Sequence, residues 1–390
     1  MRIKLVLKKI LKAQFYLKRL KLFAVVLVFI TLVIAITNFL VGENDFNLLD
    51  QMEAAKIAKQ RGNLEEHIKI LGSILDERKK SLGDTHLAVA RLSCRLVHAL
   101  AQSYAVLEDS AKIQENHIFA SKILEEATLI FKTQVGVNHW ETGMAVGQKG
   151  YLISEYQMSQ NELPSERAIL YMKEGLSIVK AELGPNDSRV MLLNSLLAGL
   201  FFHQGMYDDA EKSYQETLLW VEKSNGLQSE RLAWHLIALS DAKLMLNNLS
   251  EAFDDAERAQ SIYYKLSLKS SPEFARLSYK KGVIALLLND FNLAKENFEV
   301  SSALFASMPE RKREFTWSKQ ELEFATMLRD TGSSRHVPEQ LLEYLRLLDG
   351  RYSHLLRQPI RERKLHLETV LKIKNKAATA LKKMRGQTNA

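Results

Sequence analysis

The sequence predicts an all-α protein, a solenoid of helix pairs preceded by one transmembrane helix. The first observation is a small residue that returns every 42 residues, at Ala168, Ala210, Ala252 and Ala294, each just inside an apolar-periodic segment. A repeat of about 20 to 50 residues is typical of solenoids. The second observation is residues 22–41, which contain no charged residue. As a helix of about 30 Å, this segment is long enough to cross a bilayer.

Other small residues follow the same period on both sides of this landmark alanine. Those twelve positions before it and seven positions after it, in three successive units, are Ala198, Ser240 and Gly282, and Thr217, Ala259 and Ser301. Two antiparallel helices approach closely at such positions, because a large side chain would force them apart. The turns repeat as well, as "GMY" at 205–207, "NNL" at 247–249 and "NDF" at 289–291. Gly, Asn and Asp tolerate the backbone conformations of turns.

These patterns resemble the tetratricopeptide repeat, in the 42-residue form of the kinesin light chains. Units of that class often begin with Leu-Gly-x-x-His, and the stretches "LGDTHLAVA" and "VGVNHWETG" match with His86 and His139. The next two junctions have Asp187 and Ser229 at the histidine position. Asp and Ser are common helix N-caps. We expect the two histidines to serve the junction in a similar way.

The resemblance covers residues 46–308, as about six helix pairs. In the first three units the landmarks are His67, Ala120 and Ala168, which are 53 and 48 residues apart. We therefore expect insertions to lengthen the helices or turns of these units.

The sequence contains no motif for catalysis or for a metal. H-E-x-x-H, the P-loop and G-x-S-x-G are absent, and the ten histidines have no metal-ligand spacing. The single cysteine, Cys94, excludes an internal disulfide. Gly143, Gly147 and Gly150 lie on a predicted helix, where they indicate close helix packing and not a phosphate-binding loop. We expect no cofactor, no metal and no enzyme activity.

The resemblance implies that the first helix of each unit lines a concave groove. Carried over position by position, the groove residues are Leu192, Ser195, Phe202 and His203, then Trp234, Ile237 and Asp241, then Arg276, Tyr279 and Val283. Such a wall suits an amphipathic helix or an extended segment with apolar anchors. The alternative is that these side chains belong to the core between helices. Some relatives bind a terminal carboxylate through a Lys/Asn clamp, which this sequence replaces with Ser195, Leu196 and Gly199.

Charge is distributed unevenly along the chain. Residues 1–21 hold eight Lys or Arg and no acid, residues 43–350 are net −9, and residues 351–390 are net +9. The positive-inside rule places the basic head 1–21 in the cytoplasm and the chain after residue 42 across the membrane. A cleaved signal peptide is an alternative, and a mitochondrial inner membrane would give a head in the matrix and a body in the intermembrane space. The acidic segment 43–350 would repel nucleic acid.

Residues 309–390 are predicted to form C-terminal capping helices with a basic amphipathic tail. In the tail, Leu367, Val370, Leu371, Ala378 and Leu381 are expected to lie along one apolar stripe. The structural interpretation is a capping helix whose basic face is exposed to solvent. The functional interpretation is that residues 360–385 bind anionic lipid or an acidic surface.

Together these features predict a single-pass membrane scaffold or adaptor that binds partner proteins on the non-cytoplasmic side. In a bacterium this means the inner membrane and the periplasm, with a role in the assembly or biogenesis of a membrane complex. The first alternative is a mitochondrial inner-membrane assembly factor for a respiratory complex. The alternative from another class is an enzyme subunit with an unrecognised site.

Overall fold

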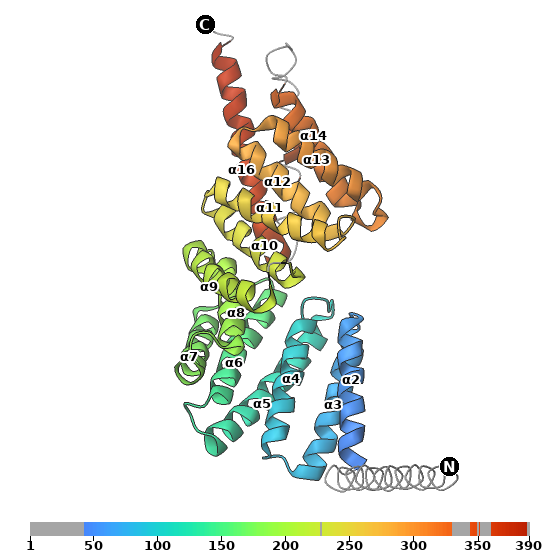
Figure 1. Cartoon of the computed structure of the whole chain (residues 1–390), viewed down its shortest axis with the longest axis vertical. Helices are drawn as coiled ribbons and strands as arrows, with labels where there is room; N and C mark the ends of the chain where they lie inside the picture. Colours follow the sequence, from blue (N-terminus) through green and yellow to red (C-terminus); the bar gives the residue numbers. More distant parts are fainter. Residues whose placement is uncertain (1–42, 227, 330–343, 349–350, 352–359, 388–390) are drawn as a thin grey trace, which may run out of the picture. The chain divides into compact units, whose positions relative to one another are not determined.

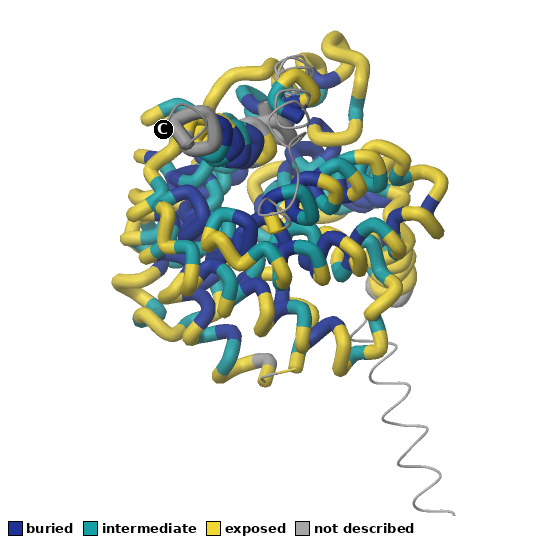
Figure 2. The backbone as a smooth tube through the Cα atoms, turned by 90° about the horizontal axis from the view of Figure 1, so that it is seen from above, coloured by how far each residue is buried: buried dark blue, intermediate teal, exposed yellow. Residues whose placement is uncertain are grey.

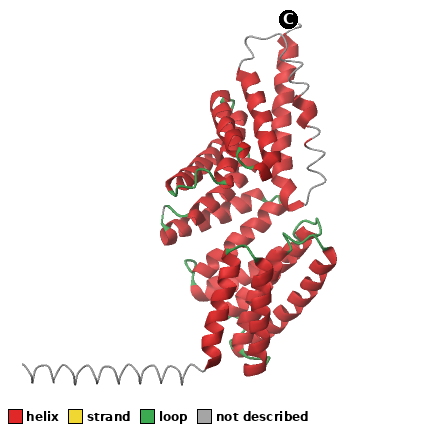
Figure 3. Cartoon of the chain, turned by 90° about the vertical axis from the view of Figure 1, so that its right-hand side faces the viewer, coloured by secondary structure: helices red, strands yellow, loops and turns green. Residues whose placement is uncertain are grey.

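The computed structural model describes residues 43–226, 228–329, 344–348, 351 and 360–387. Every secondary-structure element in these ranges is a helix (Figure 3), which confirms the predicted all-α fold. The predicted head 1–21 and transmembrane segment 22–41 lie outside the described residues. In the part that is described, no helix is both long and apolar enough to cross a membrane.

The described chain forms six consecutive helix pairs between Glu43 and Ala306. The pairs are α2 (Glu43–Gln60) and α3 (Leu64–Leu82), α4 (Leu87–Ser103) and α5 (Ser110–Gln134), α6 (Trp140–Ser159) and α7 (Glu166–Leu183), α8 (Ser188–Gln204) and α9 (Tyr207–Asn225), α10 (Glu230–Met245) and α11 (Leu249–Lys265), and α12 (Pro272–Leu288) and α13 (Phe291–Ala306). A 3₁₀ turn (Pro309–Arg311) leads into α14 (Lys312–Arg329), and α16 (Ile360–Gln387) follows. With 25 residues, α5 carries the lengthening expected in the early units.

Backbone contacts divide the chain into two compact units, which meet in sequence between Asp84 and Thr85. In the first unit, α2 packs against α3, and Nδ1 of His67 lies 2.8 Å from the carbonyl oxygen of Ala55. In the second unit, each helix from α4 to α14 contacts the next one along the chain (Figure 1).

The periodic small residues lie where the helices touch. Seven landmark alanines are fully buried, namely Ala120, Ala168, Ala198, Ala210, Ala252, Ala259 and Ala294. Ser240 is also fully buried, and its hydroxyl donates a 2.7 Å hydrogen bond to the carbonyl of Ala252. Along the chain, buried positions recur on the helices, and exposed positions gather at the outer turns (Figure 2).

The helix junctions and turns use the residues that the sequence suggests. His86 and His139 are N-caps, whose Nδ1 atoms accept hydrogen bonds from the backbone N–H groups of Ala88 (3.1 Å) and Glu141 (3.3 Å). The expected junction role of both histidines is confirmed. The repeat turns contain Gly205, Asn247 and Asn289 in the left-handed region, with φ of 85°, 65° and 68°. These three residues are of types that tolerate positive φ.

The glycines of the third unit serve close helix packing, as expected. A Cβ atom on Gly143 would lie 2.8 Å from a methyl carbon of Val179 on α7, and one on Gly150 would overlap with the backbone of Ala168. A Cβ on Gly175 of α7 would overlap with the backbone of Gly143 and Gly147. The backbones of α6 and α7 therefore approach more closely than side chains would allow.

The tail helix α16 packs into the same core as α12, α13 and α14. Its buried residues are Val370, Ile373, Ala377 and Leu381, which join the cluster around Phe298 and Phe324. The predicted stripe was wrong in part, since Ala378 is exposed and Leu371 is only half-buried, while the side chain of Leu367 lies outside the described set. Val370 and Leu381 are buried as predicted, and the stripe between them runs through Ile373 and Ala377 at helical spacing.

Polar contacts also hold α16 to the repeats. The ammonium of Lys376 donates to the carbonyl oxygen of Leu287 (3.2 Å) and to Oδ1 of Asn289 (2.6 Å), at the C-terminal end of α12. A cation is favourable at a helix C-terminus, where carbonyl groups lack partners within the helix. The hydroxyl of Tyr207 donates to the carboxylate of Glu368.

Candidate functional site

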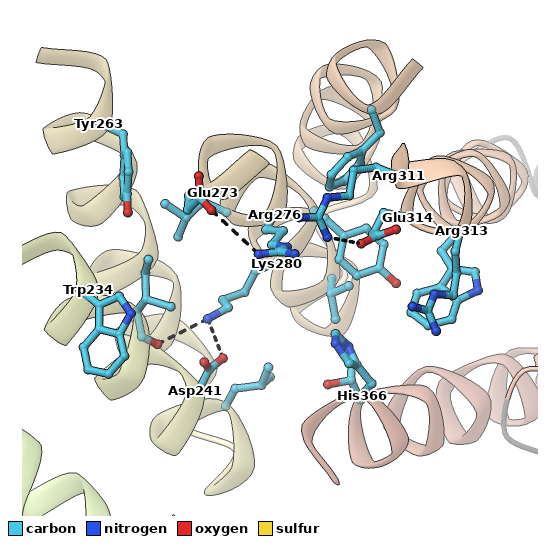
Figure 4. A pocket seen from close by; sticks show the side chains of 18 residues that line it. Trp234, Asp241, Tyr263, Glu273, Arg276, Lys280, Arg311, Arg313, Glu314 and His366 are labelled. Atoms are coloured by element: carbon cyan, nitrogen blue, oxygen red, sulfur yellow. Dashed lines mark hydrogen bonds and ion pairs between the residues drawn. The ribbon is translucent and has the colours of Figure 1, made fainter. Parts of the chain in front are cut away.

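The second unit contains a cleft of about 620 Å³ between α10, α12, the start of α14 and α16 (Figure 4). Most of its lining comes from these four helices, and three other elements add one residue each. The lining residues are Trp234, Ile237, Asp241 and Leu244 from α10, Glu273, Arg276, Leu277, Tyr279, Lys280 and Val283 from α12, Arg313, Glu314 and Trp317 from α14, and His366 and Thr369 from α16, with Tyr263 from α11, Phe305 from α13 and Arg311 from the turn before α14.

The predicted groove residues divide into two groups. The six from the last two repeats line the cleft together, namely Trp234, Ile237, Asp241, Arg276, Tyr279 and Val283. The four from α8 do not line it. Among these four, Leu192 is 41% exposed, Ser195 lies 3.5 Å from Nε2 of His235, and the ring of Phe202 packs against Tyr207 and His203.

Trp234 and Val283 have contrasting environments within the cleft. The indole of Trp234 is 61% exposed, although it belongs to one of the largest apolar side chains. Val283 is 1% exposed and packs in the core cluster with Phe324 and α16. Val283 therefore supports the wall of the cleft, and Trp234 offers a surface to a bound molecule.

An ion pair crosses the cleft from α12 to α10. Nζ of Lys280 lies 2.5 Å from Oδ1 of Asp241 and donates to the carbonyl oxygen of Ile237 at 3.3 Å (Figure 4). Both charged side chains are mostly buried. The pair satisfies the charge of Lys280 inside the protein, and it joins the two helices that carry the predicted groove residues.

The wall formed by α14 was not predicted from the sequence. Arg313 lies over the ring of Trp317, with its guanidinium carbon 5.8 Å from the ring centroid. The ring of His366 meets Trp317 edge-on at 5.8 Å, which brings α16 into the wall. The only local signal for this wall was the basic and aromatic run "ERKREFTW" at the end of the periodic region.

A buried polar network contacts this wall of the cleft. Glu321 is fully buried, and it accepts hydrogen bonds from Arg351 and from the hydroxyl of Tyr344. Arg351 also donates to Oε1 of Gln320 and lies 5.2 Å from the ring centroid of Trp317. Burial and the Glu321 carboxylate raise the pKa of Tyr279, so its hydroxyl remains neutral. Through Arg351 the network contacts Trp317 and helps to hold its ring in place.

The chemistry of the cleft is that of a binding surface. It combines exposed aromatic area with arginines, the side-chain types that are enriched where proteins bind one another. Within the described residues, no group of three or more His, Cys, Asp or Glu could hold a metal ion.

Comparison with known proteins identifies the repeats. The sequence profile of the tetratricopeptide repeat family matches residues 188–265, from α8 to the end of α11. The chain contains tetratricopeptide repeats. No curated protein sequence matches the chain.

Three solved structures are similar to the chain at low sequence identity. A signal-transduction ATPase with numerous domains and a tetratricopeptide repeat sensor, from Pyrococcus horikoshii, is 16% identical, with a TM-score of 0.56 over 80% of this chain and 43% of that one. BtubC (BKLC) from P. vanneervenii is 16% identical, with a TM-score of 0.51 over 63% of this chain and 92% of that one. A putative kinesin light chain from Podosopora anserina with nearly identical TPR-like repeats is 13% identical, with a TM-score of 0.47 over 57% and 98%.

The profile match supports the predicted repeat family, and the two structures with TM-scores above 0.5 support the predicted fold. Because stacked tetratricopeptide repeats present extended surfaces for other proteins, the chain is a protein-interaction scaffold.

Proposed function

We propose that this protein is a membrane-anchored scaffold that binds a partner protein in the cleft between α10, α12, α14 and α16. The observation that carries the proposal is Trp234, which lines the cleft while 61% of it is exposed. Tryptophan is enriched among the residues that dominate binding energy in protein interfaces. Lys280 and Asp241 form an ion pair with each other. The solvent-exposed indole near this pair is available to a partner.

The membrane part of the proposal rests on the sequence. Residues 22–41 are uncharged, the eight basic residues precede them, and Glu43 is the first charge that follows. This arrangement favours a cytoplasmic head and a repeat domain on the other side, in the bacterial periplasm. The same topology in a mitochondrial inner membrane would place the repeats in the intermembrane space. An anchored scaffold suits the assembly or biogenesis of a membrane complex, because it holds a partner beside the bilayer.

The predicted positions on α8 form a secondary part of the proposal. Leu192, Ser195, Phe202 and His203 lie outside the cleft, and Leu192 is the most exposed apolar residue of the four. A partner segment longer than the cleft would reach α8 because α8 precedes α10 in the stack of first helices.

Crosslinking from the cleft tests the binding surface. A photoreactive phenylalanine analogue replaces Trp234 in the full-length protein, and irradiated cells are examined for adducts. The matched control carries the same analogue at Tyr264, which is 63% exposed on α11 and does not line the cleft. We expect discrete adducts from position 234 and none of the same size from position 264. Equal adducts from both positions, or none from position 234, would contradict the proposal.

The lone cysteine makes the topology testable. Burial raises the pKa of Cys94 to about 12, so its thiol reacts slowly with maleimides, which attack thiolates. Single cysteines at Gln14 and at Glu65 then report on the head and the body. We expect a membrane-impermeant maleimide to label Glu65→Cys in cells with a permeabilised outer membrane, and Gln14→Cys only after lysis. The reverse pattern would show that the topology is inverted.

A further inference from the structure

Four cationic side chains line the cleft, and they differ in how well they are paired. Lys280 is satisfied by Asp241 at 2.5 Å and by the carbonyl of Ile237. The other three are Arg276, Arg311 and Arg313, from α12, the 3₁₀ turn and α14. These three arginines decide what the cleft can bind.

The hydrogen-bond donors of the three arginines are largely unused. Nη1 of Arg276 lies 3.9 Å from Glu273, which is beyond hydrogen-bond distance. Arg311 reaches Glu314 through Nη1 at 3.3 Å, but its Nε is buried and has no hydrogen-bond partner among the described residues. Of the described residues, none offers Arg313 a carboxylate, and its guanidinium lies over Trp317 instead. Figure 4 shows Arg276 beside Lys280 in the middle of the view, with Arg311 and Arg313 to its right.

Unused donors of this kind favour an anionic ligand. A guanidinium carries five N–H donors in a planar fork that matches the two oxygens of a carboxylate. Burying a donor without a partner is unfavourable, and a bound acceptor would relieve this cost. The cleft lining holds four cationic and three acidic side chains, so it is net +1, whereas residues 43–350 are net −9. This local difference gives an acidic partner a definite place to bind.

The surroundings of the arginines indicate a polypeptide ligand. The exposed indole of Trp234 and the apolar side chain of Ile237 line the same cleft, and offer contact area to an apolar side chain. A small inorganic anion would use only the arginines and would leave this area in solvent. A peptide with acidic and apolar side chains in turn would use both.

We infer that the cleft binds an acidic segment of the protein partner, with a side-chain carboxylate held by Arg276, Arg311 and Arg313 and a neighbouring apolar side chain against Trp234. This inference rests on the proposed function, and it adds the chemistry of the partner. The arginines on α14 and its preceding turn make this a site of the C-terminal segment as much as of the repeats.

A matched pair of peptides tests the inference. The probes are fluorescein-labelled Ala-Glu-Leu-Glu-Leu-Glu-Ala and the same peptide with Gln for each Glu. Both are amidated and carry the same dye, so that they differ only in their side-chain carboxylates. Fluorescence anisotropy with the detergent-solubilised full-length protein gives the two affinities. We expect the Glu peptide to bind at least about tenfold more tightly, and this difference to fall as salt screens the charges.

Arginine variants then locate the site. Arg313→Gln and Arg276→Gln should each weaken binding of the Glu peptide by about fivefold or more, because each removes a charge-assisted pair. Arg313→Lys should recover part of the loss, since it restores the charge without the fork. The control is Arg167→Gln, which changes an exposed arginine on α7 outside the cleft. It should leave the affinity unchanged.

Three results would overturn the inference: equal binding of the two peptides, no binding of either at millimolar concentration, or a Glu-peptide affinity that Arg313→Gln and Arg276→Gln leave intact. The crosslinking experiment separates this failure from a failure of the proposed function. Adducts from position 234 that persist in the Arg276→Gln, Arg313→Gln double variant would keep the scaffold and its cleft while excluding the acidic ligand. An absence of adducts in the parent protein would instead reject the cleft itself.

Discussion

Gly282 of α12 lies directly against the ring of Phe298 of α13. A Cβ atom at position 282 would stand 2.7 Å from Cδ1 and from Cε1 of that ring, which is fully buried. Gly282→Ala should therefore destabilise the protein, because overpacking costs about 1 to 3 kcal/mol and exceeds the gain of about 1 kcal/mol in helix propensity. The midpoint of urea unfolding, compared with that of the parent protein, measures the change.

An earlier repeat, the α8–α9 pair, offers a glycine with free space as the control. A Cβ atom on Gly199 of α8 would come no closer than 3.8 Å to any neighbouring atom, the hydroxyl oxygen of Tyr214. Gly199→Ala should be neutral or stabilising by up to about 1 kcal/mol, because only the helix-propensity gain applies. If both variants shift the midpoint equally, the contact with Phe298 does not explain the glycine at 282.

The buried ion pair of Glu321 and Arg351 should be expensive to break. The side chains are 0% and 3% exposed, so Glu321→Gln leaves a guanidinium charge in the core without a countercharge. The expected loss is about 3 to 5 kcal/mol in unfolding free energy. Thermal unfolding followed by circular dichroism measures it.

Glu314→Gln is the matched control for that variant. Glu314 pairs with Arg311 at 3.3 Å, where the side chains are 21% and 33% exposed. Removing this partly solvated pair should cost about 0 to 1 kcal/mol. A loss from Glu321→Gln as small as this would mean that the network in contact with Trp317 contributes little to the stability of the wall.

His117 should make stability depend on pH. Its ring stacks on Tyr156 with centroids 3.9 Å apart, and burial lowers its pKa below the ordinary 6.5. In the part of the chain that the structure describes, its buried Nδ1 has no hydrogen-bond partner. As pH falls below about 6.5, the unfolded chain binds this proton before the folded chain does, so the unfolding free energy decreases until the folded pKa is passed. Unfolding midpoints of the parent and of His117→Phe, measured across this range, test the effect.

His117→Phe keeps a ring that can stack on Tyr156 but has no group that titrates. Its stability should therefore change less with pH than that of the parent protein. His235, whose pKa burial also lowers, should retain part of the dependence in this variant. His86→Asn replaces an exposed histidine N-cap with another N-capping residue and controls for the loss of one histidine. If the stability of His117→Phe changes with pH as steeply as that of the parent protein, other groups cause the pH dependence.

The repeats could be predicted because their causes are local and recurrent. Ala210 and Ala252 are fully buried since a larger side chain would separate the paired helices, and this demand returns in every unit. Asn247 and Asn289 adopt positive φ at equivalent turns. Capping by His139 is likewise local, because its acceptor serves a backbone N–H two residues away.

Only the part of the cleft that α10 and α12 form could be predicted from the sequence. Trp234 and Arg276 follow from the repeat pattern, but Trp317 and His366 belong to helices beyond the last repeat, where no period relates one position to another. The pairing of Lys280 with Asp241 joins residues of different helices, and neither local sequence specifies the other. Long-range packing decides these contacts, so a single sequence does not contain a signal for them.

In the tail helix α16, too, long-range packing decides which residues are buried, and this gives the last prediction. Ile373 is flanked by Lys372 and Lys374, so the sequence favoured a stripe through leucines, yet Ile373 is fully buried and Leu371 is not. Ile373→Ala should cost about 2 to 5 kcal/mol and release α16, which limited proteolysis would detect as earlier cleavage within 360–387. Asn375→Ala, at an exposed position of the same helix, should leave the cleavage rate unchanged. Equal protection of both variants would show that Ile373 does not hold α16 on the repeats, and its apolar stripe would then remain available for the predicted lipid contact.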